Sequence, residues 1–333
     1  MRVAFPLIAA GTGSDVYTAA LAQGVARKGV DVEVFPFGYS MELVPWLRAP
    51  SARRKLQSFD LIHCNGDHGT IFHSPSVPMV ITFHHNVFES EYQAHTSVAQ
   101  KCYHYGLALR RIRRASRLAA AIVYCRRYTQ QSFRRLLGES MVPEHIIYNC
   151  VDTDAFVPAV DRPDDDVCEL LFVGSPTRRK GAHLLPEIMR RLGTEYRLTC
   201  VSRASFGGWD AENISVVRNA SHEELVRLYQ RSHMLLFPTL LEGFGYAVAE
   251  AMACGLPVVS SDNSAIPELI LSGKGGWLCE TQDVDAYVAR VRQLWGSVET
   301  RADMGAFNRE RVTRLFSKEN WAQSYLDLYK RLL

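Results

Sequence analysis

The chain has 333 residues, of which 47% are hydrophobic and 22% charged, and its formal net charge is +3. Such a chain is an ordinary globular protein, long enough for two domains with separate cores. No apolar run approaches the ~20 residues that a membrane-spanning helix needs, so the composition excludes a chain that crosses a bilayer.

The eight cysteines are scattered without any Cys-x-x-Cys pair, and several lie in strand-like runs such as those ending at Cys64 and Cys200. They favour buried, reduced thiols over disulfides or a zinc site. The N-terminal residues resemble a core strand more than a secretory signal, because Pro6 and Gly11 interrupt the apolar run. We therefore expect a cytoplasmic protein.

The first half of the chain alternates strand and helix patterns. An apolar run at 2–8, a helical pattern at 16–27 and a second strand at 30–35 form one strand-helix-strand unit of a parallel sheet. Further strands are predicted at 60–64, 79–85 and 119–124. The glycines at 11 and 13 begin a dinucleotide-binding pattern, but position 16 is valine, so the fingerprint of a dehydrogenase is incomplete.

A second α/β domain follows a segment at 157–166 that is rich in proline and acidic residues and has the composition of a linker. Strands are predicted at 168–174, 196–202, 214–217, 234–238, 257–260 and 276–279, with helices at 182–192 and 221–230. A last helix covers 318–333. This alternation predicts two doubly wound α/β domains.

The most informative stretch is 240–260, which reads as a strand end, a glycine-rich turn and a helix. Glu242 lies in the turn and Glu250 lies eight residues later in the helix. Gly243 and Gly245 allow close approach of the backbone, and the helix start offers free N–H groups to a phosphate. Carboxylates accept hydrogen bonds from sugar hydroxyls. A lone carboxylate would be read as a solvated residue, but this pair points to a nucleotide sugar.

A basic loop at 173–181 follows the first strand of the second half and contains Gly174, Arg179 and Lys180. Because the loop leads into a helix, its cations and the helix start converge on one place, which suits a phosphate group. An ordinary basic loop is the alternative interpretation.

The spacing of Glu242 and Glu250 resembles the Glu-x7-Glu signature of the retaining glycosyltransferases of family 4, and the resemblance extends over nearly the whole chain. It implies a GT-B fold, in which two Rossmann-like domains face a central cleft and a C-terminal helix returns to the first domain. On this basis we expect an acceptor-side domain at 1–157, a linker at 158–167, a nucleotide-sugar domain at 168–315 and a closing helix at 316–333.

The resemblance also implies roles for individual residues. Val80-Ile-Thr-Phe-His84 matches a family motif whose histidine lies near the transferred sugar, and Lys180 matches the lysine that neutralises the departing diphosphate. The expected catalytic residues are His84, Lys180 and Glu242. The expected donor-binding residues are Gly13, Ser14, Gly174, Arg179, Lys180, Gly243, Phe244, Gly245 and Glu250.

The chain departs from the family pattern at two positions. Ser175 stands where the family has an arginine, so that Arg178 or Arg179 would have to replace it, and Cys150 stands where glycine is usual. No metal or other cofactor is expected: Asp152-Thr-Asp154 lies in a turn of a fold that needs no metal, and the pair His84-His85 lacks a third ligand.

The expected activity is transfer of a hexose-type sugar from a UDP or GDP sugar to a glycan or lipid-linked acceptor, as in cell-envelope polysaccharide or glycolipid synthesis. Another GT-B enzyme, of the epimerase or phosphorylase type, and a non-catalytic protein that binds nucleotide sugars are the alternatives. Neither the base nor the sugar nor the acceptor follows from the sequence.

Residues 92–138 contain no aspartate or glutamate but carry ten basic residues. Two predicted helices, 109–118 and 126–137, lie in this stretch. Basic helix faces are most often simply solvated, but an anionic membrane surface would attract them at ~1 kcal/mol per residue. We expect peripheral contact with the inner face of the cytoplasmic membrane through Arg110–Arg135, and no nucleic-acid partner, because no binding module is recognisable.

Overall fold

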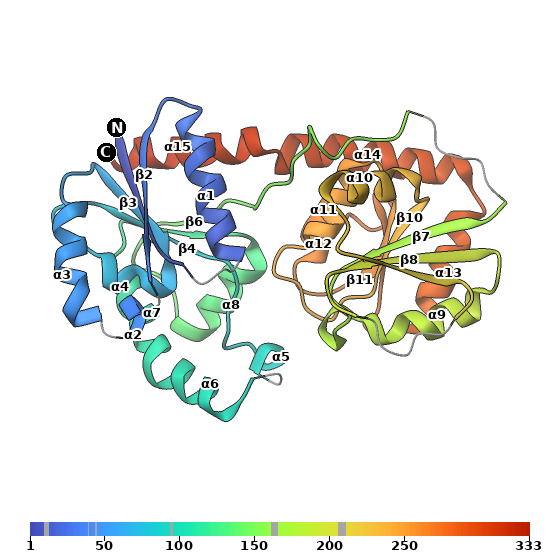
Figure 1. Ribbon diagram of the computed structural model, residues 1–333, viewed down its shortest axis with the longest axis horizontal. Helices are drawn as coiled ribbons and strands as arrows, with labels where there is room; N and C mark the ends of the chain where they lie inside the picture. The colour runs from blue at the N-terminus through green and yellow to red at the C-terminus, as the bar shows by residue number, and fades with distance from the viewer. Residues whose placement is uncertain (10–12, 39, 44, 94–95, 161–165, 206–210) are drawn as a thin grey trace. The chain divides into compact units, whose positions relative to one another are not determined.

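The structure is a computed structural model that describes residues 1–9, 13–38, 40–43, 45–93, 96–160, 166–205 and 211–333. The chain divides into two compact units: Met1–Asn149 with Glu319–Leu333, and Cys150–Lys318 (Figure 1). The middle of the predicted linker, 161–165, lies outside the described residues. No helix in the described part of the chain combines the length and apolar character that crossing a bilayer requires.

The first unit contains a sheet of six strands in the order β2-β1-β3-β4-β5-β6, and all neighbouring strands pair in parallel. The strands are β1 (Arg2–Ile8), β2 (Asp31–Phe37), β3 (Leu61–Asn65), β4 (Met79–Phe83), β5 (Ala121–Tyr124) and β6 (Glu144–Ile146). β3 and β4 are buried along almost their whole length, as expected for a parallel sheet covered on both faces.

Helices pack on both faces of this sheet. They are α1 (Gly13–Ala26), α2 (Ser40–Leu43), α3 (Pro45–Leu56), α4 (Gly69–Phe72), α5 (Ser90–Gln93), α6 (Val98–Tyr103), α7 (Leu109–Leu118), α8 (Arg127–Leu137) and α15 (Lys318–Leu332). Apolar side chains of α3, α4 and α7 join one continuous core with alternate strand residues such as Ala4 and Ile62.

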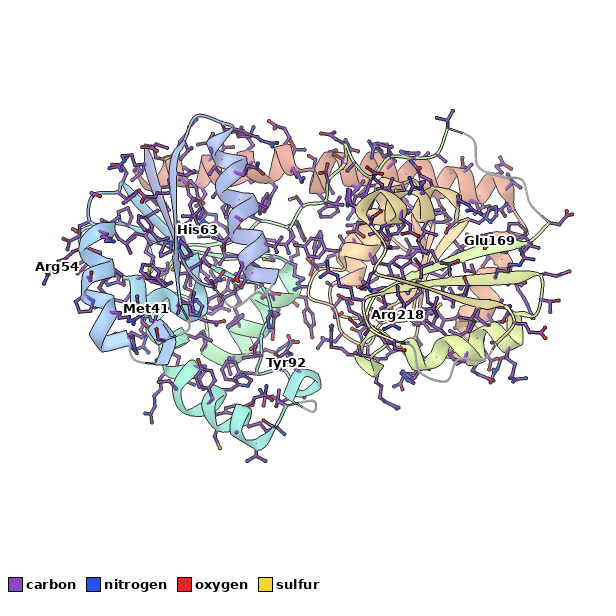
Figure 2. All side chains as sticks on the ribbon, viewed as in Figure 1. Met41, Arg54, His63, Tyr92, Glu169 and Arg218 are labelled. Carbon is purple, nitrogen blue, oxygen red and sulfur yellow. The ribbon has the colours of Figure 1, made fainter. Side chains whose placement is uncertain are left out.

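The opposite face of the first sheet carries α1 and the closing helix α15. The hydroxyl of Tyr325 on α15 hydrogen-bonds that of Tyr17 on α1. Tyr329, also on α15, hydrogen-bonds Nδ1 of His63 on β3, which Figure 2 labels among the inner side chains. An ion pair joins Lys28 to Glu319. The last helix of the chain is therefore an integral part of the first unit, as expected.

The second unit repeats the architecture with six parallel strands in the order β12-β11-β10-β7-β8-β9. The strands are β7 (Cys168–Val173), β8 (Tyr196–Ser202), β9 (Ile214–Arg218), β10 (Met234–Phe237), β11 (Val258–Ser261) and β12 (Gly276–Cys279). The helices are α9 (Leu185–Leu192), α10 (His222–Arg231), α11 (Tyr246–Ala253), α12 (Ile266–Leu269), α13 (Val284–Trp295) and α14 (Val298–Phe316).

Two doubly wound parallel sheets confirm the fold class that the alternation of strands and helices predicts. In such sheets, ligands bind at the carboxyl ends of the strands. In the second unit, β7 and β10 are neighbours, so the loops that follow Val173 and Phe237 leave the same edge of the sheet. These loops carry the basic and glycine-rich motifs of the sequence.

Candidate functional site

The basic loop after β7 ends in a short 3-10 turn, Arg178–Lys180, that the side chain of Thr177 caps by accepting from the backbone N–H of Lys180 at 3.4 Å. Gly181 ends this turn with a φ of +69°, and a Cβ atom at this position would lie 1.7 Å from the carbonyl oxygen of Pro238. Only glycine fits there, so the backbones of the two loops touch at Gly181. This close approach places the basic loop directly against the glycine-rich one.

The ammonium group of Lys180 forms an ion pair with Oε1 of Glu242. The same oxygen accepts from the hydroxyl of Thr239 at 3.2 Å. The side chain of Glu242 is only 5% exposed and that of Lys180 19% exposed, so the pair lies in a largely desolvated place. Two of the three predicted catalytic residues are thereby brought together at the carboxyl ends of β7 and β10.

The guanidinium of Arg179, which is predicted to bind the donor, reaches the neighbouring loop. This group donates to the carbonyl oxygen of Leu241 at 2.8 Å, and the carbonyl of Arg179 accepts from the backbone N–H of Leu240 at 2.8 Å. Arg179 thus holds the loop that carries Glu242.

Arg178 is exposed. Burial lowers the pKa of His183, and the neighbouring Arg178 lowers it to a smaller extent. Gly174 follows β7 directly, and its N–H donates to the carbonyl oxygen of Val201 at 3.0 Å.

Three residues that the sequence analysis did not select for the site hold Glu242 in place. The hydroxyl of Ser264 accepts from the backbone N–H of Glu242 at 2.9 Å, and the side-chain amide of Asn263 donates to the carbonyl of Leu240. Thr239 is fully buried beneath them. Ser264 has a φ of +52°, a conformation that favours glycine.

Helix α11 begins at Gly245, which has a φ of +90° and no side chain to cap the first N–H groups. Gly243 precedes it in the turn. The side chain of Phe244 is 3% exposed and packs on Tyr246 and Phe316, with ring centroids 5.1 and 6.0 Å away. Phe244 therefore anchors the turn in the core and can offer a ligand only its backbone. The uncapped N–H groups at the helix start suit an anion.

Glu250 lies on α11, and its Oε2 is 2.8 Å from the hydroxyl of Tyr229 on α10. The same hydroxyl is 3.2 Å from the carbonyl oxygen of Ala247 and donates to one of the two at a time. Burial of the carboxyl group raises the pKa of Glu250 to about 7, and the hydrogen bond from Tyr229 opposes this shift. Glu250 is accordingly a carboxyl group that gains its charge near neutral pH.

This pKa predicts a pH dependence of stability. The folded chain binds more protons than the unfolded chain between pH 4.5, the ordinary value, and about 7. The contribution of Glu250 to stability is therefore fully present below this window and is lost as the pH rises through it, by about 2 kcal/mol after allowance for solvent at a half-buried group. Urea denaturation across pH 5 to 8 should show this loss relative to Glu250→Gln. Parallel pH profiles of the two proteins would contradict the raised pKa.

In the first unit, Gly13 and Ser14 open α1, and the hydroxyl of Ser14 lies 3.5 Å from a carboxylate oxygen of Asp15. His84 follows β4. Its Nε2 is 3.2 Å from Oδ1 of Asn65, and its Nδ1 is 3.2 Å from the sulfur of Cys125. These atoms lie at the carboxyl ends of β3, β4 and β5, where a parallel sheet places its ligands.

The two departures from the family pattern do not distort the chain. Ser175 is exposed. The non-glycine residues with positive φ in the described ranges are Asn219, Ser264 and Gln282, so Cys150 carries no left-handed strain. Asp152 accepts from the backbone N–H groups of Asp154 and Ala155 and pairs with Lys318. These contacts give the Asp-x-Asp sequence a structural role in its turn.

Comparison with known proteins agrees with this architecture. Residues 11–155 match the model described as Glycosyltransferase Family 4, and residues 210–311 match that described as Glycosyl transferases group 1. Two solved structures share the fold over 99% of this chain. They are sucrose-phosphate synthase from Thermosynechococcus elongatus (TM-score 0.82, 20% identity, 98% of that chain) and HepE of Anabaena in complex with UDP (TM-score 0.80, 17% identity, 100% of that chain).

A curated relative, the GDP-mannose-dependent alpha-(1-6)-phosphatidylinositol monomannoside mannosyltransferase of Mycolicibacterium smegmatis, is 29% identical over 238 residues. The match covers 63% of this chain and spans 60% of the relative's length. The two parallel sheets, with the basic and glycine-rich loops at the edge of the second, define a GT-B glycosyltransferase fold. Within that class, the chain belongs to the family 4 glycosyltransferases.

Proposed function

We propose that the protein is a retaining glycosyltransferase that moves a hexose-type sugar from a UDP or GDP sugar to a glycan or lipid-linked acceptor, in the synthesis of cell-envelope polysaccharide or glycolipid. The observation that carries this proposal is the largely desolvated Lys180–Glu242 pair beside the uncapped start of α11. The relatives support it: one mannosyltransferase is GDP-mannose-dependent, and one structure holds UDP.

In this proposal each charged group recognises a different part of the donor. Lys180 and the N–H groups at the start of α11 stabilise the negative charge that develops on the leaving diphosphate. Glu242 accepts hydrogen bonds from hydroxyls of the transferred sugar, and Glu250 does the same for the ribose. His84 contacts the transferred sugar, and Gly13 and Ser14 lie near the diphosphate, as the family resemblance implies. No metal takes part.

The test is thermal stability of the purified protein with UDP, GDP, ADP and their common sugars. A ligand that binds only the native state raises the melting temperature by mass action, so a selective shift identifies the base. If none of these nucleotides shifts the transition at millimolar concentration, the chain is not a nucleotide-sugar enzyme.

The basic stretch that the sequence predicts for membrane contact does not form a single cationic face. Arg126 on the second of its helices is 1% exposed, and Arg134 pairs with Glu144 and Glu139. Arg127 and Arg135 of α8 are exposed, but the larger group of exposed cations lies on α7. This group consists of Arg110, Arg113, Arg114 and Arg117.

The segment before α7 adds apolar surface to these cations. Neither α6 nor the following turn, His104–Ala108, contains a buried residue. The exposed fractions of Val98, Tyr105 and Leu107 are 78%, 51% and 42%. Helical segments that combine basic and exposed apolar side chains lie well in the headgroup region of anionic bilayers. We propose that peripheral membrane contact is made by 98–117, and not by α8.

Sedimentation with vesicles tests this contact. Arg110→Glu with Arg113→Glu should lower binding to vesicles that contain phosphatidylglycerol at least tenfold, since each basic residue contributes about 1 kcal/mol near anionic lipid. The matched control, Arg231→Glu with Arg314→Glu, makes the same change in net charge at exposed residues of the second unit. Equal losses in the two variants, or no binding of the wild type at low salt, would refute the proposal.

A further inference from the structure

Both ring nitrogens of His84 have a specific partner. Nε2 is 3.2 Å from the amide oxygen of Asn65 at the end of β3, and Nδ1 is 3.2 Å from the sulfur of Cys125 just after β5. The ring of Tyr17 packs against the imidazole edge-on, with centroids 4.3 Å apart, and the Tyr17 hydroxyl is tied to Tyr325 of the closing helix. The orientation of the imidazole is therefore set by contacts from three elements, and the closing helix holds one of them in place.

These partners differ in what they can donate. An amide oxygen only accepts, so the hydrogen bond to Asn65 requires the proton of His84 on Nε2. A thiol can donate weakly, and Nδ1 of that tautomer accepts. The two contacts therefore select the same state of the ring. In that state Nε2–H donates a hydrogen bond to Asn65, and Nδ1 accepts one from Cys125.

We propose that Asn65 and Cys125 are positioning residues that hold His84 as a neutral imidazole with its proton on Nε2. Given the proposed function, His84 then offers the donor sugar a fixed hydrogen-bond donor at Nε2, whose N–H can be shared with a second acceptor. It carries no proton to or from the reacting groups. The Cys125 thiol, buried and outside the proposed mechanism, acquires a role through this contact.

The charged and titratable groups around His84 favour the neutral ring. Burial, with smaller contributions from the neighbouring His85 and Arg126, lowers the pKa of His84 to about 3. The guanidinium of Arg126 donates to the backbone carbonyl of His84 at 2.7 Å, so a cation sits beside the residue. His63, whose pKa burial lowers to about 3, is neutral as well.

The thiol and the phenol that contact the ring are also uncharged at neutral pH. Burial raises the pKa of Cys125 to about 12 and that of Tyr17 well above its ordinary value. Cys125 thus keeps its proton and remains a donor. No carboxylate is among the causes of the His84 shift that would stabilise an imidazolium.

The experiment is a two-bond proton–nitrogen NMR spectrum of protein labelled with ¹⁵N-histidine, with the signals of His84 assigned by His84→Gln. We expect the pattern of a neutral ring protonated at Nε2, unchanged between pH 5 and pH 8. The wild-type spectrum alone would overturn the proposal if it showed a ring protonated at Nδ1 or an imidazolium that forms within this range.

Variants separate positioning from a general structural effect. Asn65→Ala removes the acceptor that the described residues offer to the Nε2 proton and should change the chemical shift of Nε2, whereas Cys125→Ser, which keeps a donor at Nδ1, should leave that shift close to the wild-type value. The control is Cys64→Ser. The Cys64 thiol is buried, and it lies on the face of β3 opposite to that of Asn65. Unchanged His84 signals in Asn65→Ala would refute the assignment. Because neither a nucleotide sugar nor an acceptor substrate is added to the sample, this outcome is independent of whether the protein transfers a sugar.

Discussion

We expect Lys180→Ala to lower the turnover of sugar transfer by about two to three orders of magnitude. A preorganised donor at a site of developing negative charge commonly contributes this much, about 3 kcal/mol. Lys180 is preorganised, since the turn 178–180 and the contact at Gly181 fix its backbone and Glu242 fixes its ammonium group. Turnover within a few fold of the wild type would contradict the assignment of Lys180 to the leaving group.

The same substitution also affects stability, because it leaves the 5% exposed carboxylate of Glu242 without its cation. Loss of one partner of a buried pair destabilises a protein, here by about 1–3 kcal/mol because Lys180 is partly exposed. Adding Glu242→Gln to Lys180→Ala should recover stability without recovering turnover. Arg231→Ala, which removes an exposed cation from α10 of the same unit, should leave turnover within about twofold.

The largest effect on stability is expected for Gly181→Ala, at about 3–5 kcal/mol. The new Cβ would meet the carbonyl oxygen of Pro238 at 1.7 Å, and the residue would keep a φ of +69°. The matched control is Gly29→Ala, which has a φ of +84° and open space around the new Cβ, and should cost only the ~1–2 kcal/mol of the backbone conformation. Urea denaturation measures both, and equal losses would show that the two loops do not touch as described.

The architecture was predictable because it depends on local patterns. The apolar run 168–174 and its counterparts at 196–202 and 234–238 became β7, β8 and β10 with boundaries within one residue. The helix predicted at 221–230 is α10, and the Ser221 hydroxyl caps it by accepting from the N–H of Glu224. Helices α13 and α14 were not predicted: between the strand predicted at 276–279 and the last helix at 318–333, no element was assigned.

The site was predictable only in part. Lys180 and Glu242 were selected from their motifs, but their pairing depends on the adjacency of β7 and β10, which no local pattern contains. Ser264 and Thr239 are small polar residues whose importance arises only when the loops meet.

Tertiary contacts also changed the meaning of two basic motifs. Arg179 is predicted to bind the donor from its place in a basic loop, and the contact of its guanidinium with the carbonyl of Leu241 adds a structural role that the loop pattern does not show. The arginines of 110–135 looked like one charged surface, but burial removes Arg126 and ion pairs occupy Arg134. Periodicity shows which positions share a helix face. It does not show what packs against that face.

The measurement that tests the central claim most directly is calorimetric binding of the nucleoside diphosphate selected by the thermal panel, and of its 2′,3′-dideoxy form, to the wild type and to Glu250→Gln. If Glu250 binds the ribose hydroxyls, either change alone should weaken binding about tenfold or more, and the two together should weaken it little further, because both remove the same hydrogen bonds. Two independent losses that add, or an unchanged affinity of Glu250→Gln, would contradict a nucleotide-sugar site at the carboxyl edge of the second sheet.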